Sequence, residues 1–144
     1  LGAGQKLPLE GTVFISVRDE DKLAMLPIAQ SFAANGFKIL ATSGTSAYLH
    51  EQGIENSKIN KVSVGRPHVV DAIKNNEIQL VLNTPSDSET MNDGYKIRRA
   101  TLKYKVPYTT TMAGATAYCK GVEALKSRER TVKSVQEYHK GLEK

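Results

Sequence analysis

The chain has 144 residues, of which 40% are hydrophobic and 24% charged, and its formal net charge at pH 7 is +5. These proportions are those of one globular domain with a sizeable core, and they exclude a disordered chain and a membrane-spanning one. Most of the net positive charge, +3 of +5, lies in residues 120–144, where seven Lys or Arg are interspersed with four Glu as on a solvated helix. We therefore expect no nucleic-acid partner.

Residues 1–11 are largely polar and contain glycine and proline, which is typical of a segment between domains. We therefore interpret 1–11 as a linker remnant and place one domain at 12–144.

Cys119 is the only cysteine, which excludes an internal disulfide and gives no sign of an oxidising compartment. We expect a cytoplasmic protein without a membrane partner.

Five short runs rich in β-branched or large apolar residues predict strands, because each is too short to form a core helix. The predicted strands are 12–17, 37–41, a strand within 54–62 that ends near Lys61, 78–82 and 106–111. The run 78–82 has the composition of a strand that is buried on both faces.

The segments between and after these strands predict helices. A charged turn at 18–22 leads to a helix that ends at Asn35-Gly36, and Pro27 lies near its first turn or kinks it. The residues predicted to form its buried face are Leu23, Leu26, Ala29, Phe32 and Ala33. Further helices are predicted at 47–53, 68–75, 95–104, 113–126 and 132–140.

This alternation of strands and helices predicts an α/β domain around a mainly parallel sheet, in which ligands bind beyond the carboxyl ends of the strands. Polar side chains stand at all five of these ends, and Lys22 at the start of the first helix joins them. They are Ser16, Thr42, Lys61, Asn83-Thr84 and Thr109-Thr110-Thr111. The set predicts a pocket for an anionic, hydroxyl-rich small molecule.

The stretch Thr42-Ser43-Gly44-Thr45 is the strongest single signal in this set. As a loop that leaves a strand and opens a helix, it offers N–H groups, hydroxyls and the positive end of a helix dipole to a phosphate. It is equally consistent with an ordinary turn, in which Thr45 caps the helix and Gly44 supplies an unusual backbone angle. The other strand ends favour the phosphate site, since Lys22 and Lys61 would add charge and Asn83 could bind a sugar or a base.

The sequence shows no paired carboxylates, no Ser/His/Asp set and no cluster of metal ligands. His50, His68 and His139 stand apart, and we interpret each as a surface or capping residue. The predicted pocket is therefore built for binding, with no catalytic residue and no metal.

Several short motifs, taken together and in order, support a family resemblance. They are Ile15-Ser16-Val17-Arg18 with Asp21-Lys22, Gly36-Phe37, Ala41-Thr42-Ser43-Gly44-Thr45, Asn60-Lys61-Val62 with Gly65-Arg66-Pro67-His68, Asn83-Thr84, Ile97-Arg98-Arg99 and Tyr104-Lys105-Val106. The chain resembles, from Gly11 to about His139, the C-terminal domain of the carbamoyl phosphate synthetase large subunit. That domain is the regulatory member of the methylglyoxal-synthase-like fold.

The resemblance implies a three-layer fold, in which a five-stranded parallel sheet has helices on both faces. It also implies an allosteric domain that binds a nucleotide monophosphate, such as the inhibitor UMP or IMP, beyond the carboxyl ends of the strands. The implied contacts are Ser16, Lys22, Thr42, Thr45, Lys61 and Asn83, to which the strand ends add Gly44 and Thr84. Pro85 stands where those enzymes carry a further threonine, so that hydroxyl contact is not expected here.

The resemblance implies further partners beyond the nucleotide. Tyr108 and Thr110 match contacts of the activator ornithine, which binds where the domain meets the rest of the subunit. The parent ligase makes carbamoyl phosphate for pyrimidine and arginine biosynthesis, together with a glutaminase small subunit. ATP and Mg or Mn ions belong to the synthetase domains, and this domain needs no cofactor and catalyses nothing.

The alternative is methylglyoxal synthase, which acts on dihydroxyacetone phosphate and needs a carboxylate base in the phosphate pocket. That family places aspartates after the third and fourth strands. Here those positions fall near Pro67-His68 and Pro85-Ser86, with Asp71 and Asp87 displaced. We therefore rank the regulatory domain first.

Overall fold

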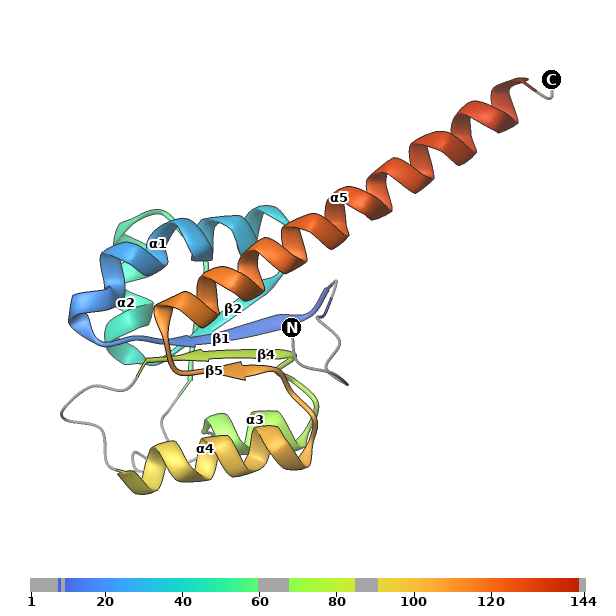
Figure 1. Ribbon diagram of the computed structural model, residues 1–144. Coiled ribbons are helices and arrows are strands. Elements are labelled where there is room, and N and C mark those ends of the chain that lie inside the picture. Colours follow the sequence, from blue (N-terminus) through green and yellow to red (C-terminus); the bar gives the residue numbers. More distant parts are fainter. Residues whose placement is uncertain (1–7, 9, 60–67, 85–90, 143–144) are drawn as a thin grey trace.

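The computed structural model describes the backbone of residues 8, 10–59, 68–84 and 91–142, and their side chains except those of 91–94 and 129–142. Strands and helices alternate along this part of the chain (Figure 1). The strands are β1 (Thr12–Ser16), β2 (Lys38–Ala41), β3 (Ser57–Lys58), β4 (Leu80–Asn83) and β5 (Tyr108–Thr109). The helices are α1 (Asp19–Ala34), α2 (Ser43–Glu51), α3 (Val69–Lys74), α4 (Met91–Lys103) and α5 (Met112–Leu142).

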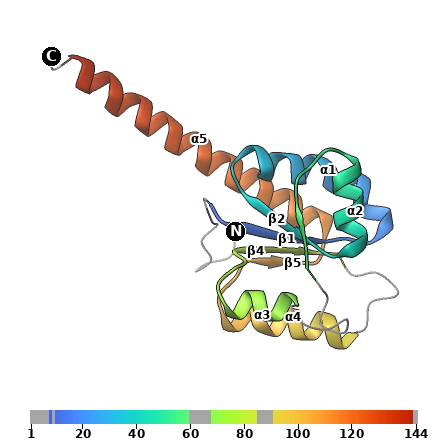
Figure 2. The same ribbon diagram turned by 180° about the vertical axis from the view of Figure 1, so that it is seen from behind.

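The five strands form one sheet in the order β3-β2-β1-β4-β5, and every pair is parallel, which confirms the predicted fold class. Helices α1, α2 and α5 cover one face of the sheet, and α3 and α4 cover the other (Figures 1 and 2). The chain moves outward through β2 and β3, crosses back to β4 and continues to β5. Helices on opposite faces give both halves the right-handed crossover that parallel sheets require.

Alternate residues of the central strands supply two apolar cores, one on each face of the sheet. Val13 and Ile15 of β1 belong to the core under α1 and α5, where Ala115, Cys119 and Val122 of α5 pack. Phe14 points to the other face and packs in the core under α3 and α4. Both faces are thus buried, as expected for a parallel sheet between helical layers.

The predicted strands differ from the observed ones mainly at their ends. The third strand ends at Lys58, earlier than predicted, and Lys61 lies outside the described residues. The fourth runs through Asn83, and the fifth contracts to two residues. Residues 1–7 and 9 of the predicted linker also lie outside the described residues.

The charged segment 18–22 was wrongly predicted to be a turn, because α1 already begins at Asp19. Acidic residues in a first helical turn interact favourably with the helix dipole, so this composition fits a helix start. The predicted buried face is also partly wrong, since Leu23 is 75% exposed and Ala33 is exposed. The buried residues are Met25, Ile28, Ala29 and Phe32, which follow the i, i+3, i+4, i+7 spacing, and Pro27 lies inside the helix.

Helix α5 replaces the two helices predicted at 113–126 and 132–140, which is a further correction. The residues between them contain no glycine or proline, so nothing in the sequence interrupts the helix. Its second half runs beyond the end of the sheet (Figure 1). Helix α4 likewise begins at Met91, four residues before the prediction, whereas α3 matches its predicted position.

Candidate functional site

The candidate site lies at the carboxyl ends of the central strands, where the sheet order reverses between β1 and β4. Ser16 at the end of β1 pairs in register with Asn83 at the end of β4. Connections leave these neighbouring strands toward opposite faces, so side chains beyond the strand ends line a crevice. Ser16, Thr42, Thr45, Asn83 and Thr84 are all buried polar residues at this end, and we call them the rim.

The segment 42–45 was wrongly predicted to be a loop, because helix α2 begins at Ser43 and Thr42 is its N-cap residue. Neither part of the simpler interpretation holds: Thr45 does not cap the helix, and Gly44 is not among the described residues with positive φ. Ser43 and Gly44 are exposed in the first turn, where helical N–H groups have no partner within the helix. The helix end therefore faces the rim with its positive pole.

Two hydroxyl contacts join β1 to helix α2. The hydroxyls of Ser16 and Thr42 lie 2.9 Å apart, within hydrogen-bond distance. The backbone N–H of Val17 donates to the Thr45 hydroxyl over 3.2 Å. The chain just after β1 is therefore tied to the first turn of the neighbouring helix by side chains that a ligand would also contact.

The last residue of β4, Asn83, and Thr84 after it complete the rim from the other side. The backbone N–H of Arg18 donates to the Thr84 hydroxyl over 3.1 Å, and the N–H of Thr84 donates to the Ser16 carbonyl over 2.9 Å. Asn83 is 2% exposed, and its Oδ1 atom has no hydrogen-bond partner among the described residues. A buried amide oxygen without a partner is unfavourable, so Asn83 is suited to accept a hydrogen bond from a ligand.

Lys22 provides positive charge beside this crevice. Its side chain is 17% exposed, and its Nζ atom lies 3.8 Å from the point that a Cβ atom on Gly44 would occupy. The ammonium group therefore stands over the first turn of α2. Lys22 is also paired with Asp19, and this ammonium group lowers the pKa of the Asp19 carboxyl by a hydrogen bond and by Coulomb attraction.

The structure brings together most of the residues predicted from the sequence. Ser16, Thr42 and Thr45 are joined by the contacts above, Lys22 stands over Gly44, and Asn83 and Thr84 adjoin Ser16. Lys61 and Pro85 lie outside the described residues. Sequence reasoning missed Asp19, although its i, i+3 spacing from Lys22 is a helical pairing signal once α1 begins at Asp19.

The two residues predicted to contact ornithine belong to the outer strand. Tyr108 is half-buried in β5, and its carbonyl accepts a hydrogen bond of 3.3 Å from the hydroxyl of Tyr118 on α5. Thr110 follows β5 and is exposed. They lie at the same edge of the sheet as the rim, two strands away from β1.

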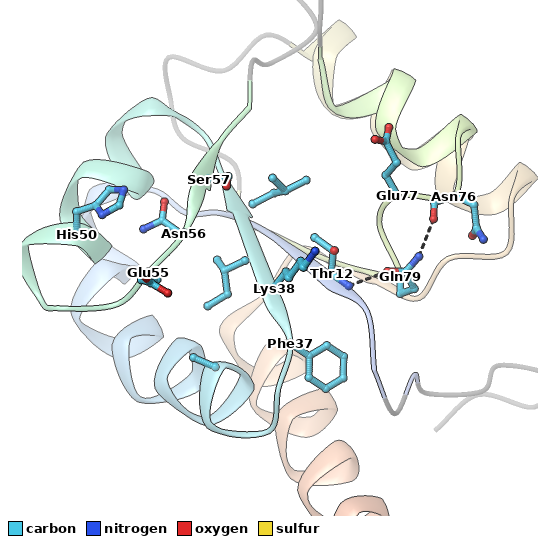
Figure 3. A pocket seen from close by; sticks show the side chains of 13 residues that line it. Thr12, Phe37, Lys38, His50, Glu55, Asn56, Ser57, Asn76, Glu77 and Gln79 are labelled. Carbon is cyan, nitrogen blue, oxygen red and sulfur yellow. Dashed lines mark hydrogen bonds between the residues drawn. The ribbon is translucent and has the colours of Figure 1, made fainter.

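A separate groove of about 820 Å³ lies toward the other end of the sheet (Figure 3). Thr12 and Lys38, the first residues of β1 and β2, line it, and Gln79 accepts a 2.7 Å hydrogen bond from the Thr12 N–H. This groove is distinct from the rim, whose residues lie at the carboxyl ends of the strands.

Across the described ranges, no group of three His, Cys, Asp or Glu could hold a metal ion. None of the described helices combines the length and apolar character of a membrane span.

Comparison with known sequences places the chain in a family. The MGS-like domain family model matches residues 24–110. The chain is 53% identical over 138 residues to the carbamoyl phosphate synthase large chain of Rhizobium meliloti (strain 1021), and 51% identical over 140 residues to that of Archaeoglobus fulgidus. Each match covers 96% of this chain but only 12% or 13% of the relative. The carbamoyl phosphate synthase large chain, C-terminal section, of Methanopyrus kandleri is 48% identical over 98% of this chain and 26% of that protein.

Two solved structures share the fold. Methylglyoxal synthase from Elizabethkingia anophelis NUHP1 has a TM-score of 0.60 and 18% identity, over 78% of this chain and 79% of that one. ForH has a TM-score of 0.53 and 18% identity, over 82% and 80% of the two chains. At this identity they establish the architecture alone. The family match, the five-stranded parallel sheet and the extent of the sequence matches together show that the chain belongs to the MGS-like domain family and matches a segment of carbamoyl phosphate synthase large chains.

Proposed function

We propose that this chain is the allosteric domain of a carbamoyl phosphate synthase large chain, and that it binds a nucleotide monophosphate such as UMP or IMP at the rim. The phosphate would lie over the first turn of α2, between Lys22 and the hydroxyls of Thr42 and Thr45. The sugar or base would reach the Asn83 side chain. The domain itself would carry out no chemistry.

The observation that carries this proposal is the pairing of a cationic helix end with an unsatisfied buried amide. The first turn of α2 and the Lys22 ammonium offer charge and directed donors to one phosphate. Asn83 Oδ1 is buried beside Ser16 and has no partner within the described ranges, so it is suited to a donor such as a ribose hydroxyl or a base N–H. A nucleotide monophosphate supplies both kinds of group.

The regulated activity belongs to the parent protein, in keeping with relatives about eight times longer than this chain. In this proposal the remaining part of the large chain, together with a glutaminase small subunit, forms carbamoyl phosphate and binds ATP and Mg or Mn ions. A nucleotide can change that activity only if it binds one arrangement of the enzyme more tightly than another. Ornithine would act at Tyr108 and Thr110, where the domain meets the rest of the large chain.

Binding to the 144-residue chain provides the direct test. We expect UMP or IMP to bind saturably by calorimetry, and uridine, which lacks the phosphate, to bind at least about tenfold more weakly, because it forfeits the charge-assisted contacts. Bound nucleotide should also raise the unfolding temperature, since it binds only the folded chain. Absence of saturable binding of both nucleotides would rule out the rim as a nucleotide site.

Incubation with dihydroxyacetone phosphate separates this proposal from methylglyoxal synthase. The rim residues include no carboxylate, and Asp71 lies on α3, where its backbone N–H contacts His68 Nδ1 over 3.4 Å. We expect methylglyoxal release no faster than in a blank without protein. Release above the blank that is lost in a Lys22→Met variant would replace the regulatory proposal with the enzymatic one.

A further inference from the structure

The lysine of the proposed phosphate site is already held by a carboxylate of its own helix. Asp19 and Lys22 lie three residues apart in the first turn of α1, and their side chains form an ion pair. Lys22 is the inner partner, whereas the Asp19 side chain is 90% exposed. Because the ammonium group also stands over Gly44, Asp19 and a bound anion would need the same cation.

The other carboxylates of this turn are engaged elsewhere. Asp21 accepts a 2.7 Å hydrogen bond from Arg18 Nε, and Glu20 lies 3.6 Å from the same atom. In the part of the chain that the structure describes, Asp19 is the one carboxylate paired with Lys22. In this first turn, Glu20 and Asp21 therefore lie near Arg18, and Asp19 is the acidic residue that pairs with Lys22 of the proposed site.

We propose that Asp19 is an intramolecular competitor for the anionic ligand and thereby sets the affinity of the rim. The inference rests on the proposed function. A ligand phosphate reaches Lys22 only after the Asp19 carboxylate turns away into water, which its exposure permits. The apparent dissociation constant is then the intrinsic constant divided by the fraction of molecules in which Lys22 is free.

The size of the effect follows from the exposure of the pair. Ion pairs between solvent-exposed groups shift equilibria by only a few fold, because water and salt screen them. The carboxylate also repels a phosphate that binds beside it. Together these effects predict that Asp19 weakens anion binding by about 3- to 10-fold at low salt, and less at high salt.

Asp19→Asn tests this directly, because it keeps the shape of the side chain and removes its charge. Calorimetry with UMP and IMP should show binding about 3- to 10-fold tighter than to the unmodified chain. Glu20→Gln is the matched control. It removes the same charge at the next residue, and the Glu20 carboxylate lies near Arg18, not near Lys22. We expect it to change the affinity by less than about twofold. Equal tightening in both variants would show a general charge effect and overturn the role of Asp19.

A double-mutant cycle isolates the competition for Lys22. In a Lys22→Met background there is no ammonium to compete for, and only the repulsion between the carboxylate and the phosphate remains, so Asp19→Asn should improve the weakened affinity clearly less than it does in the unmodified chain. The same 3- to 10-fold gain in that background would contradict the proposal. So would an Asp19→Asn variant that binds no more tightly than the unmodified chain.

The Asp19 carboxyl itself gives a second readout in the unmodified chain. Because Lys22 lowers the pKa of this carboxyl, transfer of the ammonium to a bound phosphate should raise it. Carbon-13 NMR titration with and without saturating UMP measures this shift, and an unchanged or lowered pKa would contradict the competition. If UMP and IMP bind neither the unmodified chain nor Asp19→Asn, the proposed function fails, whereas binding that is insensitive to Asp19 refutes this inference alone.

Discussion

Replacing Lys22 by methionine is expected to weaken the binding of UMP and IMP by about 10- to 100-fold, or about 1.5–3 kcal/mol, the usual range for a hydrogen bond to a charged group. Lys22 carries this effect because its side chain is only 17% exposed and its ammonium group stands over the first turn of α2. Methionine keeps an unbranched apolar stem of similar length and removes only the charged end. It also leaves the Asp19 carboxylate without its cation beside the ligand.

Calorimetry at two ionic strengths measures this loss, and Lys38→Met is the matched control. Lys38 is exposed at the first position of β2, at the opposite end of the sheet, and the control removes the same charge. We expect Lys38→Met to bind UMP within about twofold of the unmodified chain. Similar losses in both variants would mean that net charge governs binding, and an unchanged affinity in Lys22→Met would exclude this site. Thr45→Ala is a less clean probe, because it also removes the acceptor of the Val17 N–H.

Replacing Phe32 by alanine is expected to lower the free energy of unfolding by about 3–5 kcal/mol, the usual range for loss of a buried phenyl ring. Phe32 is fully buried in the core between the sheet, α1 and α5. Its ring meets that of Phe37 edge to face, with centroids 5.2 Å apart. Removal of the ring leaves a cavity and also ends this aromatic contact.

Urea unfolding followed by circular dichroism provides the measurement, with Leu23→Ala as the control on the same helix. Leu23 is 75% exposed, so its truncation should change stability by no more than about 0.5 kcal/mol. If Phe32→Ala does not fold, Phe32→Leu retains most of the apolar volume and should cost about 1–1.5 kcal/mol. Equal losses at Leu23 and Phe32 would contradict the observed orientation of α1.

The comparison of Leu23 with Phe32 also shows why sequence periodicity placed α1 incompletely. Once 18–22 was interpreted as a turn, Leu23 became the first candidate core residue of the helix. With the true start at Asp19, the spacing of Met25, Ile28, Ala29 and Phe32 identifies the buried face. The signal that would have corrected the start was the run of acidic residues at a helix N-terminus.

The composition of the rim was more predictable than its local structure. Ser16 and Asn83 could be placed together because parallel strands bring their carboxyl ends to one edge, and the register confirms that they are partners. That Thr42 is an N-cap residue without a side-chain cap bond could not be read from the sequence. A threonine before a helix serves equally well as a cap, and here its hydroxyl lies beside Ser16, a residue far away in the sequence.

Sequence periodicity could not predict the hydrogen bonds of the site, because they join residues that are far apart in the sequence. The bond from the Arg18 N–H to the Thr84 hydroxyl joins residues 66 positions apart and depends on the register of β1 and β4. That Asn83 Oδ1 lacks a hydrogen-bond partner in the part of the chain that the structure describes likewise becomes visible only once its surroundings are known. The sequence therefore predicted which side chains lie together at the rim, whereas the structure shows which of them already form hydrogen bonds within the protein.

The continuous helix α5 extends well beyond the end of the sheet (Figure 1). Its 31 residues span about 46 Å at a rise of 1.5 Å per residue. Its first half is anchored on α1, where the Ser31 hydroxyl donates a 2.5 Å bond to Glu123, and α1 begins with Asp19 and Lys22. Leu142 lies 19 residues beyond Glu123, or about 28 Å, so a tilt of about 5° at this anchor displaces it by about 2.5 Å, by the geometry of a straight rod. A small rotation of α1 that carried α5 with it would therefore move the far end of this helix farther than the residues near the anchor.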